Sequence, residues 1–175
     1  MSHYKKVIQD YISDNKAKTI DLLKQLVMEN SVSGNESKAQ AIVLEKLREL
    51  ELDLDVWEPD LKEMKEHPYF ISTRDSFTGS PNIVATLKGT SGGKSMILNG
   101  HIDVVPEGNI QQWTYPPYAA TVVDNKLYGR GATDMKGGNV ALILAIEAIK
   151  RSEITLKGNV YFQSVTEEEC GGAGT

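Results

Sequence analysis

A strand–helix–strand order in the second half of the chain constrains the fold more than any other feature. The apolar runs SMILNG (95–100) and LKGNVYFQSV (156–165) have the length and composition of buried strands. Between them, MKGGNVALILAIEAIKR (135–151) is apolar around most of its circumference and ends in a basic pair, which suits the negative end of a helix dipole. We therefore predict an α/β fold, in which ligands bind beyond the carboxyl ends of the strands.

Helical periodicity marks the N-terminal part of the chain. Apolar side chains recur at steps of three and four over 4–28, which predicts one long helix or two with a break near Asn15. A second amphipathic helix is expected over 39–50, after a run of turn-forming residues. Residues 58–81 contain three prolines and few apolar positions, so we expect a long loop, and loops of this length inside a domain are often functional.

Three further segments have strand patterns. LDLDVW (52–57) alternates apolar and polar side chains, as a half-buried strand does. NIVATLKG (82–89) is joined to the strand at 95–100 by the Gly-rich TSGGK, which predicts a hairpin or a tight connection. TVVDNKLYG (121–129) predicts a second hairpin, because Asp and Asn tolerate the positive φ that its turn demands.

The composition argues against several classes of partner. The net charge is -5 and the lysines are scattered, whereas nucleic-acid binding needs clustered basic residues. No apolar run reaches the ~20 residues that span a bilayer, and the polar start is unlike a signal peptide, so we predict a cytoplasmic protein without a membrane partner. The one cysteine, Cys170, fits a reducing compartment.

Two sets of polar residues lie at predicted strand or helix ends. His101 and Asp103 are two residues apart in an extended segment, so they project to the same face. A carboxylate in this place fixes the tautomer and orientation of a metal-binding histidine, although a surface histidine with a nearby acid explains the fragment equally well. Asp134 precedes a helix, where it either caps the helix or uses the close backbone approach that its neighbouring glycines allow.

Three acids, Glu167, Glu168 and Glu169, directly follow the strand at 156–165. A charge run usually marks a solvated surface, but at a strand end it lies where sites form. Repulsion among closely held carboxylates raises a pKa, and a divalent cation removes that cost. One histidine and several carboxylates match the ligand set of zinc, with manganese or cobalt as substitutes, and leave an acid free to act as a general base.

Four motifs in this order, GHIDVVP, QQWTYPPY, DNKLYGRGATDMKGG and TEEECGGAGT, resemble the dinuclear zinc hydrolase family that includes acetylornithine deacetylase, succinyl-diaminopimelate desuccinylase, aminoacylase and related carboxypeptidases. The resemblance covers 98–175, and more weakly the helical start with SVSG. It implies a three-layer α/β/α sandwich of the zinc-peptidase type, incomplete in this chain. Residues 1–175 would be the N-terminal portion of the catalytic domain, without the lid and dimerisation domain and without the family's later acidic and histidine ligands.

Position by position, the resemblance assigns five roles. His101 would bind one zinc ion, and Asp103 would be the acid that orients its ring. Asp134 would bridge both metal ions, and the peptide bond after it is expected to be cis. Glu168 would be the general base, and Glu169 the ligand of the other zinc ion. The first acid of the triplet receives no direct role, and the cysteine after the triplet is expected to be a small packed residue.

The reaction implied is amide hydrolysis with two divalent ions, zinc or else cobalt or manganese. A water bridging the ions would lose its proton to Glu168 and attack the carbonyl, and the glutamate would pass the proton to the leaving amine. The leading substrate is a small N-acyl amino acid, as in acetylornithine deacetylase. Dipeptidase or carboxypeptidase activity stays open, as does another N-acyl amine such as a formylated heterocycle. Loop residues His67, Tyr69 and Arg74 are candidates to touch substrate, although solvent exposure is the expected state of such side chains.

A non-catalytic, truncated metal-binding remnant is the alternative from a different class. It predicts fewer than two bound metal ions and no hydrolysis. The 175 residues alone are expected to hydrolyse little or nothing. An exposed apolar sheet edge is prone to pair with another copy, which predicts a homo-oligomer.

Overall fold

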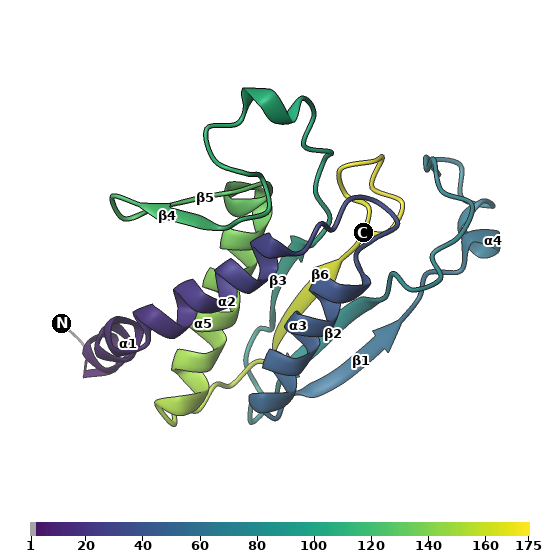
Figure 1. Cartoon of the computed structure of the whole chain (residues 1–175). Coiled ribbons are helices and arrows are strands. Elements are labelled where there is room, and N and C mark those ends of the chain that lie inside the picture. Colours follow the sequence, from purple (N-terminus) through teal and green to yellow (C-terminus); the bar gives the residue numbers. More distant parts are fainter. Residues whose placement is uncertain (1–2) are drawn as a thin grey trace.

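A computed structural model, which describes residues 3–175, shows a four-stranded sheet with helices packed against it (Figure 1). In chain order the elements are α1 (His3–Asp14), α2 (Lys16–Met28), α3 (Ser37–Glu49), β1 (Asp53–Trp57), α4 (Leu61–Met64), β2 (Asn82–Leu87), β3 (Met96–His101), a 3-10 turn (Ile110–Gln112), β4 (Thr121–Val123), β5 (Lys126–Tyr128), a π-helical segment (Ala132–Lys136), α5 (Gly137–Arg151) and β6 (Val160–Val165). The strand order of the main sheet is β1–β2–β6–β3, and β4 and β5 form a separate hairpin.

β6 lies between β2 and β3, antiparallel to the first and parallel to the second. The predicted hairpin between 82–89 and 95–100 is therefore wrong. The Gly-rich segment bonds instead to the approach of β6, since the amides of Thr90 and Ser91 donate to the carbonyls of Leu156 and Lys157. Gly93 of this segment and the preceding Gly89 allow this pairing, because a side chain at either position would collide with Lys157 or Gly158.

The helices cover one face of the sheet. Side chains of α2, α3 and α5 form a single buried cluster with the inward residues of the strands, among them Ile83 of β2 and Phe162 of β6. On the other face, Ile97 of β3 and Trp57 of β1 are 61% and 42% exposed. The α/β class is confirmed, and residues 3–175 supply the sheet and one helical layer of the incomplete sandwich that the sequence predicts.

Most of the predicted elements are confirmed. The first helical stretch is broken at Asn15, which separates α1 from α2. Its side chain donates a hydrogen bond to the Tyr11 carbonyl. The β4–β5 hairpin turns through Asp124 and Asn125, with φ of 48° and 60°. The sequence patterns did not predict α4, which begins after Asp60; the Asp60 side chain accepts hydrogen bonds from the backbone N–H groups of Lys62 and Glu63. Within residues 3–175, no helix combines the length and apolarity that crossing a membrane requires.

Candidate metal centre

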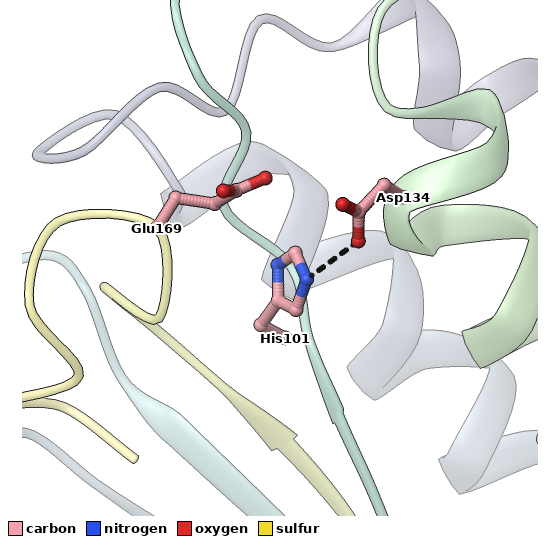
Figure 2. Close-up of side chains that lie close together, drawn as sticks. All are labelled: His101, Asp134 and Glu169. Carbon is pink, nitrogen blue, oxygen red and sulfur yellow. Dashed lines mark hydrogen bonds and ion pairs between the residues drawn. The ribbon is translucent and has the colours of Figure 1, made fainter.

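Parallel pairing of β3 and β6 brings their carboxyl ends to one edge of the sheet. His101 is the last residue of β3 and lies opposite Val165, the last residue of β6. The acids after β6 therefore emerge beside the histidine, and the π-helical segment before α5 supplies Asp134 from the other side. His101, Asp134 and Glu169 thereby come together (Figure 2). Their ligand atoms all lie within 4.8 Å of one another.

The His101 ring is buried and held by both nitrogens. Nδ1 lies 2.9 Å from the backbone carbonyl of Asp103, and because a carbonyl only accepts, Nδ1 carries the proton. Nε2 then presents a lone pair, and it faces Asp134 Oδ1 at 3.1 Å. Two acceptors this close need a cation or a proton between them, and a divalent ion satisfies both. The donor set of one imidazole and two carboxylates therefore fits zinc.

The carboxylate of Asp103 is fully buried. It lies closer to the backbone of residues 167–169, which we call the glutamate turn, than to the histidine ring. Its two oxygens accept the backbone N–H groups of Glu168 and Glu169 at 3.1 and 3.0 Å, while Oδ1 lies 3.7 Å from His101 Nδ1. The backbone carbonyl of the same residue is the nearer partner of the ring. Asp103 thus joins the end of β3 to the turn after β6.

Asp134 lies in a kinked segment that begins after Gly131, whose φ is 76°. Its peptide bond to Met135 is cis, as the resemblance implied. The alternative role as a helix cap is not supported, because in the described part of the chain no backbone N–H bonds to its carboxylate, and the side chain is 75% exposed. Lys136, two residues on, is buried and donates to the carbonyls of Leu26 and Glu29, which ties this segment to the end of α2.

The glutamate triplet divides into two parts. Glu168 is 53% exposed, with Oε2 3.8 Å from His101 Nε2, so it faces the same space as the three clustered residues. Burial raises the pKa of Glu169, and the Asp134 carboxylate raises it further. Glu167 is instead fully buried, and its carboxylate contacts Ser72 and Arg74. Burial raises the pKa of this carboxyl group against the opposing effects of the same two residues.

Two of the three candidate residues of the 58–81 loop are exposed to solvent, as the sequence predicted, and one is not. His67 and Tyr69 are exposed. The Arg74 side chain is only 7% exposed, which makes the expectation of solvent exposure wrong, because two buried carboxylates pair with it. Cys170, next to Glu169, is half-buried and has a free thiol.

Comparisons with known proteins find relatives in sequence and in structure. Residues 97–175 match the sequence model of peptidase family M20/M25/M40. The chain is 35% identical over 170 residues to the N-formyl-4-amino-5-aminomethyl-2-methylpyrimidine deformylase of Halalkalibacterium halodurans, covering 94% of this chain and 36% of that protein. It is 32% identical over 173 residues to the Bacillus subtilis enzyme of the same name, covering 96% and 37%. The chain thus spans a little over a third of the length of these relatives.

Solved structures resemble the chain over nearly its whole length. Human carnosine dipeptidase 1 is 29% identical, with a TM-score of 0.71 over 92% of this chain and 34% of that one. The dipeptidase Dug1p of Saccharomyces cerevisiae has a TM-score of 0.76 at 22% identity, over 97% of this chain and 36% of that one. The second likeness concerns the fold alone.

Proposed function

This chain belongs to peptidase family M20/M25/M40 through residues 97–175, and from that premise we propose that it forms part of a metal-dependent amide hydrolase. The observation that carries the proposal is the convergence of His101, Asp134 and Glu169 from three separate segments. We also propose that residues 1–175 are the N-terminal portion of the catalytic domain. The match covers only 36% and 37% of the lengths of the two deformylases, which supports this proposal.

The three convergent residues would hold divalent metal, with two zinc ions as the specific proposal and Asp134 shared between them. When bound, the ions would supply Lewis acidity for an amide carbonyl and for water. Glu168 would take a proton from the attacking water at its exposed carboxylate and give it to the leaving amine. Asp103 would hold the amides of the glutamate turn and keep the protonated Nδ1 of His101 in place.

The substrate proposed is a small amine carrying a short acyl group. The two curated relatives, at 35% and 32% identity, are named as deformylases of an aminomethylpyrimidine, which favours the N-formyl heterocycle over the acetylornithine-type substrate that the resemblance placed first. Dipeptide hydrolysis is the second candidate, supported by the 29% identity to carnosine dipeptidase 1. Homo-oligomer formation and a cytoplasmic location stay predictions.

A binding experiment tests the proposal without requiring turnover by these 175 residues. The chain is loaded with Co²⁺, and its visible absorption is recorded while 4-amino-5-aminomethyl-2-methylpyrimidine, ornithine or a dipeptide is added. We expect the pyrimidine amine to change the spectrum at lower concentration than the other two. A larger response to the dipeptide favours the second candidate. A chain that takes up no cobalt contradicts the hydrolase proposal, and uptake below two equivalents with no ligand response supports the non-catalytic remnant.

A further inference from the structure

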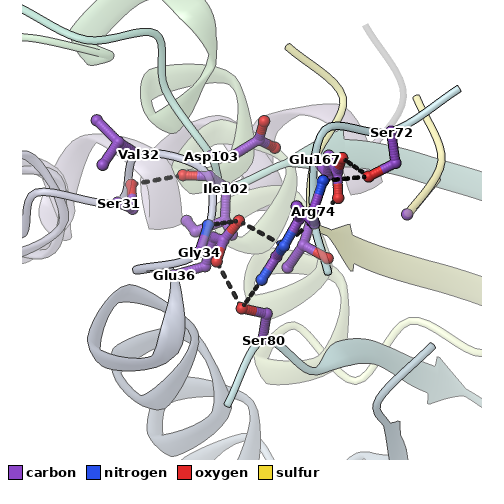
Figure 3. Close-up of polar contacts among 12 residues, drawn as sticks. Ser31, Val32, Gly34, Glu36, Ser72, Arg74, Ser80, Ile102, Asp103 and Glu167 are labelled. Carbon is purple, nitrogen blue, oxygen red and sulfur yellow. Dashed lines mark hydrogen bonds and ion pairs between the residues drawn. The ribbon is translucent and has the colours of Figure 1, made fainter. Parts of the chain in front are cut away.

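Glu167 is the acid of the triplet that the metal cluster does not use, and its backbone has an unusual conformation. Its φ is 62°, in the left-handed region that non-glycine residues rarely adopt. Its side chain runs into the interior, where Ser72 Oγ donates a hydrogen bond to one carboxylate oxygen and Arg74 Nε lies 3.5 Å from the other (Figure 3). Contacts from the 58–81 loop therefore hold the residue that sets the direction of the glutamate turn.

Arg74 occupies the junction of three segments. Nη1 donates to Glu36 Oε1 at 3.0 Å, at the start of α3. Nη2 donates to Ser80 Oγ, and that hydroxyl donates in turn to Glu36 Oε2 at 2.6 Å. Nε donates to the Ser76 carbonyl at 3.1 Å within the loop. The hydrogen bonds of the planar guanidinium thus join α3 to the loop, and the 3.5 Å ion pair of Nε with Glu167 adds the turn after β6.

Charge balance makes this arginine hard to replace. Glu36, Asp103 and Glu167 are all fully buried, and a buried carboxylate is costly unless it is paired and hydrogen-bonded. Within residues 3–175, the ion pairs made by Glu36 and Glu167 are both to Arg74. Its loss would leave both buried carboxylates without a cation, and one of them, Glu167, is the sequence neighbour of Glu168.

We propose that Arg74 and Glu167 form a buried clamp that positions the metal-binding turn, with both acting as positioning residues. The clamp holds Glu167 on one side of the turn, and Asp103 holds the amides of Glu168 and Glu169 on the other. Anchored from both sides, the turn keeps the Glu169 carboxylate within reach of His101 and Asp134. This inference rests on the proposed metal centre and extends it to a loop that supplies none of the three convergent ligands.

The first test is Co²⁺ affinity and the visible spectrum of the bound ion. Substituting a residue that supports a metal ligand typically weakens affinity about 10–100-fold, and we expect Arg74→Met to fall in this range with an altered spectrum. Arg74→Lys keeps the positive charge but loses the planar set of N–H donors, so its Co²⁺ affinity should lie between those of Arg74→Met and the wild type. Glu167→Gln, which keeps the shape, should weaken affinity in the same direction by a smaller factor. The matched control is Arg48→Met, since that arginine is on the surface of α3 and 61% exposed.

The second test needs no metal. Hydrogen exchange of the Glu168 and Glu169 amides is measured in the metal-free chain, with the amides of α5 as an internal reference. We expect exchange at the turn to be about tenfold faster in Arg74→Met, without a comparable change in α5 or in Arg48→Met.

The outcomes separate the clamp from the proposed function. If the unmodified chain binds no cobalt, the metal centre fails and the amide exchange alone decides the clamp. If Arg74→Met does not fold, Glu167→Gln carries both measurements. The clamp is overturned if a folded variant keeps wild-type cobalt affinity or, where no cobalt binds, if its turn amides exchange at the wild-type rate.

Discussion

Replacing Asp103 with asparagine tests whether this carboxylate organises the edge of the sheet. The side chain is fully buried and accepts two backbone N–H groups, from Glu168 and Glu169. An amide offers one oxygen and one NH₂ group, so one of the two N–H groups would face a donor and lose its partner. A hydrogen bond to a charged acceptor is worth about 1.5–3 kcal/mol, and leaving a buried donor unsatisfied costs about 1–3 kcal/mol, or more when the lost partner is charged; both ranges describe the same lost interaction.

We therefore expect Asp103→Asn to lower the free energy of unfolding by about 2–4 kcal/mol. For a chain of this size each kcal/mol corresponds to roughly 2–4 °C, so the melting temperature of the metal-free protein should fall by about 5–15 °C. Urea unfolding followed by circular dichroism at pH 7 measures the first quantity, and a thermal scan measures the second. Asp21→Asn is the control, because Asp21 is an exposed residue of α2. A loss of stability no greater than that of the control would mean that the Asp103 carboxylate does not hold the turn.

Three further predictions concern the surroundings of the site. Lys136→Met removes the ammonium that donates to the carbonyls of Leu26 and Glu29, at the end of α2 and just after it, and we expect urea unfolding to show a loss of about 1–3 kcal/mol in the free energy of unfolding. Gly100→Ala places a methyl group against the Asn139 side chain, which donates to the His101 carbonyl at 2.6 Å, so Co²⁺ affinity should fall about tenfold or more; unchanged affinity would contradict the packing argument. Burial and a hydrogen bond to Glu107 raise the pKa of Tyr118 to about 12, so the unfolded chain ionises first and the wild type should lose stability in urea unfolding as the pH rises above 10, whereas Tyr118→Phe should lose less.

The sequence could predict that the metal-binding side chains converge, because they lie at or just after the ends of strands. His101 ends β3 and the glutamates follow β6, and parallel neighbours deliver their carboxyl ends to the same edge. The order of the strands was harder to predict. A Gly-rich segment between two strand patterns is compatible both with a hairpin and with pairing to a distant segment, and here residues 156–159 pair with it. Only the complete set of inter-strand hydrogen bonds distinguishes the two.

The clamp of Arg74 and Glu167 had no local signal. The residues are far apart in the sequence, and neither lies in a periodic segment that would mark it as buried. Polar residues of a loop are usually exposed, which is why the sequence favoured exposure for Arg74. A charge run is usually solvated, yet the positive φ of Glu167 turns one acid of the run inward. Long-range pairing of buried charges decides such cases, and it becomes visible only in the folded chain.

Metal binding by the unmodified chain tests the central claim most directly. The metal-free protein is titrated with Zn²⁺ and with Co²⁺, and the same titrations are made on His101→Asn and on His67→Asn, which alters an exposed histidine of the loop. We expect the wild type and His67→Asn to bind divalent metal alike, and His101→Asn to bind at least about tenfold more weakly. Absence of binding by the wild type, or equal binding by all three proteins, would contradict the proposed metal centre.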